Sequence, residues 1–257
     1  MVKSWQTHQK LLIHPHIIRL FHFFEDSENF YLIHEFLDRT LNTLFTKRKK
    51  LIEREAFLLF AQIALALDFL HKKSILHKRL NFSTTFLDSQ GNIRLSDFGQ
   101  MVDFSDQKTL AHLAPETLKD RLFTPQNDIW GLGLILYEMI HGHKAFRNGE
   151  LKIFSFVSDE CTDLITRILN PNLEERINLE GILTHAWMKK YEDVYKIKLK
   201  GYIHKESYEE RATEGTIRTF IPTFKSRFSK RNSILFDNIK PDFLGSFYNR
   251  ISFADES

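Results

Sequence analysis

The segment that most limits how this chain can fold is an apolar stretch at 127–142, with the sequence NDIWGLGLILYEMIHG. Its apolar residues cover nearly the whole circumference of a helix, so a helix here must be buried on all sides. Glu138 interrupts the longest apolar run, which is also too short to cross a bilayer, so no membrane span is expected. The rest of the chain must therefore enclose this helix in a globular core.

Helical periodicity continues outside this segment. A strong helix is predicted at 53–73, where five apolar residues recur at helical spacing: Phe57, Phe60, Ala64, Leu67 and Leu70. Shorter amphipathic helices are predicted at 40–50, 161–170 and 178–191, and residues 1–13 have the pattern of the end of a polar helix. Helices should therefore make up most of the domain.

Strand signals are fewer and lie mainly near the N-terminus. Two β-branched and aromatic runs, 14–24 and 29–36, flank a short acidic turn and predict two strands. A Gln-Gly-Asn turn inside 84–96 predicts a hairpin. Strands followed mostly by helices indicate an α+β domain that is mainly α.

Composition limits the class of protein. A length of 257 residues, 42% hydrophobic and 27% charged, suits one large domain or a domain with a tail. The formal net charge of +3 is too small to argue for a nucleic-acid partner. The single cysteine cannot form an intrachain disulfide and the N-terminus has no apolar signal core, which predicts a cytoplasmic or nuclear protein.

The pattern changes near Tyr191, where periodicity is lost. Within the last part of the chain, 221–250 carries six basic and two acidic residues, so its net charge is +4. This composition predicts a basic tail, rich in phenylalanine and serine and largely disordered. Three serines closely follow basic residues and are candidate phosphorylation sites: Ser229, Ser233 and Ser252.

One stretch, ILHKRLNFSTTFLDSQGNIRLSDFGQ at 75–100, raises the question of chemistry. It resembles the catalytic loop His-Arg-Asp-Leu-x-x-x-Asn of protein kinases, followed by their Asp-Phe-Gly motif. Further along, LAPE (113–116), DIWGLG (128–133) and EER (174–176) resemble other kinase motifs in the same order. Over residues 5–190 the chain thus resembles the eukaryotic protein kinase superfamily, nearest to Ser/Thr kinases of the Aurora or calmodulin-kinase type.

This resemblance implies a kinase-like fold with a helical large lobe and an incomplete small β lobe. Residues 1–37 would be a remnant of the small lobe that ends in the hinge, 38–190 the large lobe, and 191–257 the tail. The glycine-rich loop and the lysine that orient ATP would precede Met1, so we expect a truncated small lobe. In the hinge, Glu35 and Leu37 could still hold adenine.

The catalytic loop itself departs from the kinase pattern. The degenerate positions are His77, Lys78, Arg79, Asn81 and Thr84. Arg79 stands where the resemblance requires the catalytic aspartate, and Thr84 stands where it requires a metal-binding asparagine. A catalytic base must accept the proton of the substrate hydroxyl, and arginine cannot do so because its pKa exceeds about 12. Asp97 of Asp-Phe-Gly remains as a possible Mg²⁺ ligand.

Residues that stabilise the large lobe are retained. The resemblance implies that Glu116 forms a buried ion pair with Arg176 and that Asp128 binds the backbone of the catalytic loop. It also implies that Phe98 fills the core, beside His77, and that Gly99 permits the turn after it. By contrast, the segment between Asp-Phe-Gly and Ala-Pro-Glu is short, and little room is left after the buried helix for the helix that binds substrate peptides.

The favoured interpretation is a pseudokinase that acts as a scaffold or allosteric module and binds protein partners, such as another kinase or a kinase substrate. One alternative is an active Ser/Thr kinase that transfers phosphate from ATP, with ATP and Mg²⁺ as cofactors. Another is a shortened chain without a stable fold. The pseudokinase interpretation requires neither ATP nor Mg²⁺.

Overall fold

The computed structural model describes residues 12–26, 29–99, 102–106, 110–147, 150–153 and 156–191. The chain divides into two units, Met1–Leu199 and Lys200–Ser257, and all described residues belong to the first. The candidate phosphorylation sites Ser229, Ser233 and Ser252 lie outside the described residues, as does most of the helix predicted at the N-terminus.

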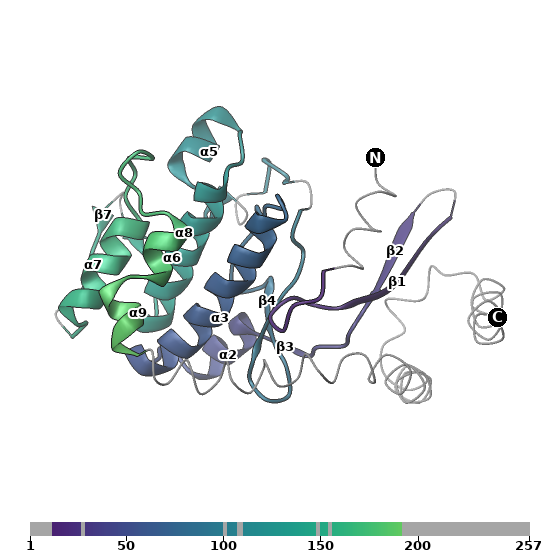
Figure 1. Ribbon diagram of the computed structural model, residues 1–257, viewed down its shortest axis with the longest axis horizontal. Helices are drawn as coiled ribbons and strands as arrows, with labels where there is room; N and C mark the ends of the chain where they lie inside the picture. The colour runs from purple at the N-terminus through teal and green to yellow at the C-terminus, as the bar shows by residue number, and fades with distance from the viewer. Residues whose placement is uncertain are drawn as a thin grey trace. The chain divides into compact units, whose positions relative to one another are not determined.

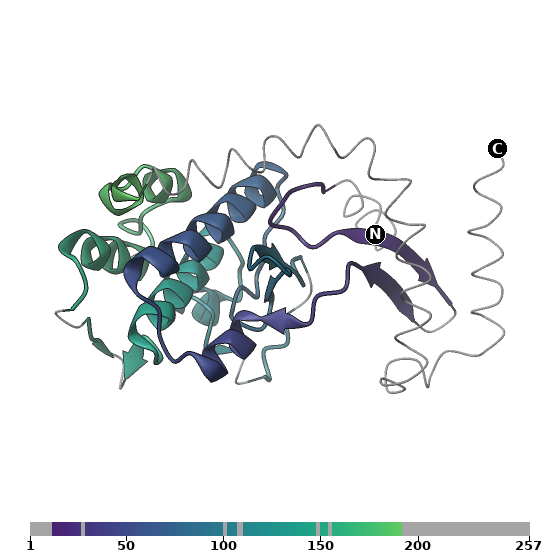
Figure 2. The same cartoon turned by 90° about the horizontal axis from the view of Figure 1, so that it is seen from below.

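Helices dominate the described residues (Figure 1). They are α2 (Leu41–Lys47), α3 (Glu53–Lys72), α5 (Pro115–Asp120), α6 (Pro125–His141), α7 (Asp159–Ile168), α8 (Leu179–Leu183) and α9 (Ala186–Lys190). The two longest, α3 and α6, run side by side and pack against each other (Figure 2). None of the helices in this part of the chain is long and apolar enough to cross a membrane.

Within the residues that the structure describes, the strands form three small antiparallel sheets. One pairs β1 (Leu20–Glu25) with β2 (Phe30–His34), and another pairs β6 (Phe146–Arg147) with β7 (Glu150–Leu151). The third has the order β3 (Arg39–Thr40), β4 (Thr85–Leu87) and β5 (Ile93–Leu95). The predicted class, α+β and mainly α, is confirmed.

The centre of the core is α6. Every residue from Asn127 to His141 except Glu138 is buried, as its apolar circumference predicts. Gly133 lies at the contact with α7, where an added Cβ would stand 2.3 Å from Cγ2 of Ile168. Only glycine allows the two helices to approach this closely.

Several of the predicted elements were wrong in extent, among them the helix predicted at 40–50, which ends at Lys47. The helix predicted at 178–191 is two helices, because His185 is extended (φ −64°, ψ 151°) and its Nδ1 accepts the N–H of Trp187 to begin α9. The strand predicted at 14–24 begins only at Leu20. Before it, Ile17 makes a single parallel bridge to Leu95, so this segment follows β5 instead of β2.

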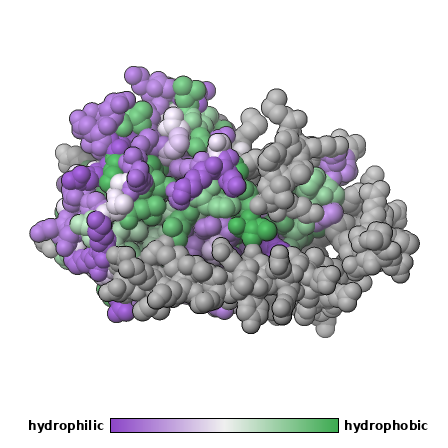
Figure 3. All heavy atoms as spheres, viewed as in Figure 1, coloured by the Kyte–Doolittle hydropathy of each residue, from purple (hydrophilic) through white to green (hydrophobic). Residues whose placement is uncertain are grey.

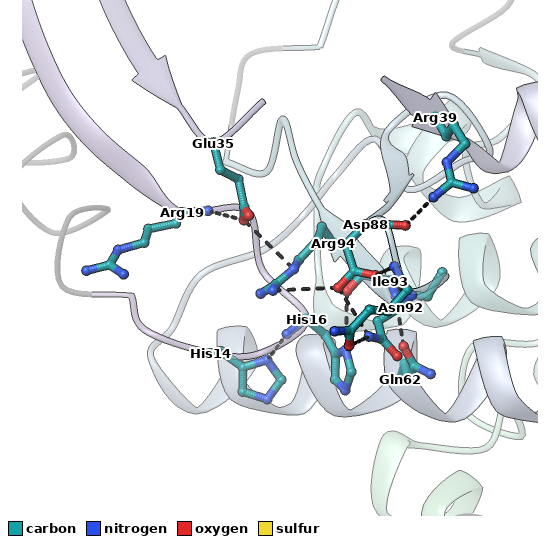
Figure 4. A network of polar contacts seen from close by, with 11 residues as sticks. His14, His16, Arg19, Glu35, Arg39, Gln62, Asp88, Asn92, Ile93 and Arg94 are labelled. Atoms are coloured by element: carbon teal, nitrogen blue, oxygen red, sulfur yellow. Dashed lines mark hydrogen bonds and ion pairs between the residues drawn. The ribbon is translucent and has the colours of Figure 1, made fainter. Parts of the chain in front are cut away.

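A polar network joins the segment before β1, the end of β2 and the β4–β5 hairpin (Figure 4). Arg94 lies between two carboxylates, with Nε 3.9 Å from Oε1 of Glu35 and Nη2 3.8 Å from Oδ2 of Asp88. Glu35 Oε1 also accepts the N–H of Arg19 at 2.9 Å, and Arg39 donates to the carbonyl of Asp88 at 2.7 Å. Asp88 is thus engaged in fixing the hairpin.

Two histidines lie within this junction. His16 is 1% exposed, and its Nδ1 lies 3.2 Å from the carbonyl oxygen of Ile93. The ring of His14 stacks on Phe69 with centroids 4.9 Å apart. Burial lowers the pKa of His14 to about 4 and that of His16 to about 3. Both rings are therefore neutral in the folded chain at neutral pH.

A buried ion pair anchors α5. Arg176 donates Nη1 to Oε1 of Glu116 at 2.6 Å and Nη2 to Oε2 at 2.9 Å. Its Nε donates to the carbonyl of Asn170 at 2.9 Å. The Arg176 side chain is 0% exposed and that of Glu116 is 17% exposed, so the arginine depends on this carboxylate for its charge partner.

We expect Glu116→Gln to lower the free energy of unfolding by about 3 kcal/mol, because it leaves the buried Arg176 without a counter-charge. Glu174→Gln removes an exposed carboxylate from the same loop as Arg176 and should change stability by less than about 0.5 kcal/mol. Urea unfolding of the two variants and the wild type measures the difference. Equal stabilities of the two variants would contradict this assignment.

We also expect the chain to lose stability in mild acid. His16 has a folded pKa of about 3 and would titrate near 6.5 when unfolded, so its contribution is complete above pH 6.5 and is lost as the pH falls towards 3. At pH 5 the loss from His16 should reach about 1–2 kcal/mol. Unfolding at pH 7.5 and 5.0 should show a smaller pH effect for His16→Gln than for wild type. An identical pH effect in both proteins would refute this.

Candidate functional site

The degenerate loop lies between α3 and β4 and is held by one buried carboxylate. Asp128, in the first turn of α6, accepts the N–H of His77 at 2.8 Å and that of Lys78 at 2.7 Å. His71 on α3 places its Nε2 2.8 Å from Oδ2 of the same carboxylate. Asp128 is 0% exposed. It therefore fixes the loop's backbone to both long helices, in the role that the kinase resemblance implies.

The side chains of Asn81 and Thr84 close the loop on itself. Asn81 donates Nδ2 to the carbonyl of Arg79 at 2.9 Å, and its Oδ1 accepts the N–H of Ser83 at 2.8 Å. The Thr84 hydroxyl accepts the N–H of Asn81 at 3.1 Å and lies 3.0 Å from the carbonyl oxygen of Arg79. The polar atoms at both positions are thus engaged inside the loop.

Arg79 adds a guanidinium to the loop. The residue is half-buried, and its Nε is buried without a hydrogen-bond partner in the part of the chain that the structure describes. Its charge acts on Asp103, whose pKa is lowered by hydrogen bonds from Ser105 and further by Arg79. A guanidinium cannot accept a proton from a hydroxyl.

Asp97 is the first residue of the Asp-Phe-Gly motif. It is exposed and has a left-handed backbone, with φ +57°, which is uncommon for a residue with a side chain. Burial lowers the pKa of His34 and of His77, and in both the negative charge of Asp97 opposes that effect. Asp97 is therefore near His34 at the end of β2 and near His77 in the loop.

The two residues after Asp97 have roles in the fold. Phe98 is 1% exposed, and its ring centroid is 6.4 Å from that of His77 in an edge-to-face arrangement. Gly99 has φ +73°, and its N–H donates to the carbonyl of Leu76 at 3.0 Å. Core packing and turn geometry are sufficient to explain both residues.

The residues present do not fit the magnesium centre of a kinase. Mg²⁺ at phosphate-transfer sites is held by one or two protein oxygen ligands together with waters and substrate phosphates. The Thr84 hydroxyl, at the position where the resemblance requires a metal-binding asparagine, is engaged by the loop. Asp97 is the single candidate ligand left from the motif.

The hinge candidates lie at the end of β2. The N–H of Glu35 donates to the carbonyl of Arg19 at 3.0 Å, and its carboxylate faces Arg94. Leu37 is half-buried and packs against the core. An adenine ring here would depend on the Glu35 carbonyl and on Leu37, because the N–H of Glu35 is already used.

Two residues that hold the site were missed from the sequence. Asn127 accepts the N–H of Ala114 at 3.2 Å and donates to the carbonyl of Lys78 at 3.4 Å, so it links the loop to the segment before α5. His71 contacts Asp128. Polar residues on otherwise apolar helices were the available signal for both.

Two aromatic rings lie near Lys78 of the loop. Phe104 and Phe123 have ring centroids 6.0 Å apart. Lys78 Nζ is 5.7 Å from the centroid of Phe123, and Arg121 Cζ is 5.2 Å from that of Phe104. The short segment after Asp-Phe-Gly is thus connected to the loop by cation–π contacts.

Comparison with known proteins bears on this arrangement. The Aurora kinase of Schizosaccharomyces pombe is 35% identical over 205 residues, which are 72% of this chain and 58% of that protein. CBL-interacting protein kinase 1 of Oryza sativa is 33% identical over 207 residues, 70% of this chain and 44% of that protein. The chain spans about half the length of the curated relatives it matches.

A family model covers a larger share of the chain. The model for the protein kinase domain matches residues 2–188, which include the degenerate loop, Asp97 and the Glu116–Arg176 pair. The match extends over more than half of the sequence and agrees with the order of motifs and with the helical fold. The chain therefore belongs to the protein kinase family.

Proposed function

We propose that the chain is a catalytically impaired, kinase-like protein, a pseudokinase that acts as a scaffold or allosteric interaction module in phosphorylation signalling. The observation that carries this proposal is Arg79. A permanently charged guanidinium stands where the family resemblance requires a proton acceptor, and none of the residues between His77 and Leu87 has a carboxylate.

The contacts of the loop support the same function. Kinase catalysis depends on positioning and on stabilising charge at the transferred phosphoryl group. Asn81 and Thr84 use their polar atoms to close the loop, so they have none directed at a phosphate or a metal. Restoring chemistry would require a changed hydrogen-bond pattern as well as a new carboxylate.

The proposed role in protein interactions rests on the residues that still stabilise the helical part. The Glu116–Arg176 pair and the contacts of Asp128 stabilise the helical part without contributing to phosphoryl transfer. In this proposal the partners are proteins, for example another kinase or a kinase substrate, and the chain acts in the cytoplasm or nucleus. ATP and Mg²⁺ are not needed for such a role.

The alternative is a Ser/Thr protein kinase that transfers phosphate from ATP to proteins. Asp97 favours it, since the residue keeps the left-handed backbone of a functional turn and is exposed to solvent. In that case Asp97 would bind Mg²⁺, and Glu35 and Leu37 would contact adenine. The two candidates differ in whether phosphate is transferred.

We expect the purified full chain to transfer no phosphate from radiolabelled ATP to a mixture of protein substrates above the level of Asp97→Ala. The single change Arg79→Asp should also leave the chain inactive, because Thr84 and Asn81 still close the loop. A positive control with an active Ser/Thr kinase sets the detection limit. Turnover by the wild type that Asp97→Ala abolishes would establish the alternative.

Thermal melting with ATP gives an independent measurement. A ligand present at 100 times its Kd stabilises the folded chain by about 2.7 kcal/mol. We expect millimolar ATP to produce no Mg²⁺-dependent rise in Tm, because the polar atoms of Asn81 and Thr84 are hydrogen-bonded within the loop and leave Asp97 as the candidate ligand of the motif. A magnesium-dependent rise that is lost in Asp97→Ala would show instead that Asp97 binds a metal–nucleotide complex.

A further inference from the structure

The loop between α2 and α3 carries a run of four basic residues. All four are exposed: Lys47, Arg48, Lys49 and Lys50. Arg54, in the first turn of α3, is exposed as well. Arg48 is paired, because its Nη2 lies 2.6 Å from Oε2 of Glu55. Within the described residues the three lysines and Arg54 form no ion pair, so four cations are left without a counter-charge.

The backbone of this loop is fixed against the end of α6. Leu51 is 5% exposed, and its N–H donates to the carbonyl of Met139 at 2.7 Å. Gly142, which ends α6 with φ +74°, lies so close to the loop that an added Cβ would stand 2.7 Å from the carbonyl oxygen of Lys49. The lysine side chains therefore extend from a backbone with a defined position.

Two exposed apolar side chains come to the same place from distant parts of the sequence. Ile52 is 65% exposed and Phe156 is 57% exposed. Lys50 Nζ lies 4.8 Å from the ring centroid of Phe156. The Glu53 carboxylate accepts both the N–H and the hydroxyl of Ser158 at 2.7 Å, which ties the segment of Phe156 to the start of α3. We call Ile52, Phe156 and the four unpaired cations the basic–apolar patch.

The carboxylates near this patch are largely engaged. Residues 47–55 contain five basic and two acidic residues, so their net charge is +3. Both acidic residues are used by the contacts given above. Close by, Glu160 is paired with Lys190 at 3.0 Å. Asp159, exposed in the first turn of α7, opposes the positive charge. The patch as a whole is therefore positive.

Helix ends explain part of this charge. Cations are favourable near the C-terminus of a helix, and Lys47 lies in the last turn of α2 while the loop lies against the end of α6. Helix ends do not explain why two apolar side chains are exposed among the cations, because burying them would be favourable. Single exposed apolar residues are common, whereas a pair held together beside unpaired cations indicates an interaction surface.

Exposed apolar residues at α5 have different surroundings. Leu118 is 44% exposed and Leu122 is 69% exposed, and the residues between them are of mixed charge: Lys119, Asp120 and Arg121. Over α5, apolar and hydrophilic residues lie next to one another on the surface (Figure 3). In Figure 1, α5 lies at the upper edge of the helical part and α2 at the lower edge. The α5 surface is therefore a matched control for the basic–apolar patch.

We propose that the basic–apolar patch binds an anionic membrane surface, with its cations at the lipid headgroups and Ile52 and Phe156 inserted between them. This inference goes beyond the proposed function and does not depend on it. The cytoplasmic leaflet of cell membranes carries such a negative surface, and each lysine or arginine near it strengthens binding about fivefold.

The chemistry of the patch favours a membrane over an acidic peptide. Three of its four cations are lysines, which are compact point charges without the fork that arginine offers to one carboxylate. Such charges suit an array of many headgroups. Ile52 and Phe156 are each more than half exposed, as side chains that enter the headgroup region must be. The apolar residues that dominate protein interfaces instead pair with pockets on the partner.

The test measures co-sedimentation of the full chain with vesicles of phosphatidylcholine, with and without about 30% phosphatidylserine. We expect the affinity for the anionic vesicles to be at least about tenfold higher than for the neutral ones. Raising the salt from about 0.1 M to about 1 M should remove this difference, because the screening length falls from about 10 Å to about 3 Å.

Charge variants separate the patch from the basic tail. The first replaces three lysines of the loop: Lys47→Gln, Lys49→Gln and Lys50→Gln. The control removes the same charge from the tail: Lys225→Gln, Arg227→Gln and Lys230→Gln. We expect the loop variant to lose at least about tenfold in affinity for the anionic vesicles, and the tail variant to lose less than about threefold.

An apolar pair of variants tests insertion. Ile52→Ser should weaken binding to the anionic vesicles at least about threefold, because it removes apolar surface that the membrane would bury. Leu122→Ser alters a residue of similar exposure on α5 and should have no effect. Both side chains are exposed, so the melting temperatures of the two variants should equal that of the wild type.

Several results would overturn the inference: equal binding to neutral and anionic vesicles, a loss in the tail variant as large as in the loop variant, or undiminished binding by Ile52→Ser. Binding of poly-glutamate that the loop variant loses, without binding of vesicles, would assign the patch to an acidic protein segment instead. None of these measurements involves phosphate transfer, so their failure leaves the pseudokinase proposal to its own assay.

Discussion

The arrangement of the site depends on one buried carboxylate, Asp128. It is fully enclosed at the start of the central helix α6, and burial of an unpaired charge would be strongly destabilising. Two backbone N–H groups of the loop and the ring of His71 satisfy it. Because of these contacts, the path of the loop is determined by the need to satisfy a charge in the core, whatever side chains the loop carries.

That dependence explains how a kinase-like loop can keep its shape while its side chains change. Asp128, Phe98 and the Glu116–Arg176 pair are each buried or ion-paired, so any substitution there affects stability. Arg79 and Asn81 stand at positions where the kinase resemblance requires residues that take part in phosphoryl transfer. Replacing those residues leaves the core intact. The proposed pseudokinase follows from this division between residues that hold the fold and residues that would act on a substrate.

Much of the fold could be predicted because the hydrophobic periodicity of a helix can be recognised within its own segment of sequence. The burial of α6 and the extent of α3 follow directly from their sequences. The break at His185 could not be predicted, because it depends on a ring nitrogen that accepts the N–H of Trp187 and begins a new helix. The segment before Leu20 looked like a strand by composition, but its partner is Leu95, far along the chain.

The site was predictable in a similar, uneven way. The identity of Arg79 could be recognised from the motif around it, whereas the unpaired state of its Nε depends on which groups the fold brings near. The inward hydrogen bonds of Thr84 and the link that Asn127 makes between Lys78 and Ala114 are tertiary features. Sequence spacing contains no information about either contact.

The close approach at Gly133 has a mechanical consequence. Because Gly133 has no side chain, the Ile168 side chain of α7 lies directly against the backbone of α6, and sliding one helix along the other would bring these atoms into a steric clash. We therefore expect α6 and α7 to move together as one rigid unit. Asp128, which accepts two N–H groups of the loop, lies in the first turn of the same helix, so a shift of α6 would also shift the carboxylate that holds the loop containing Arg79.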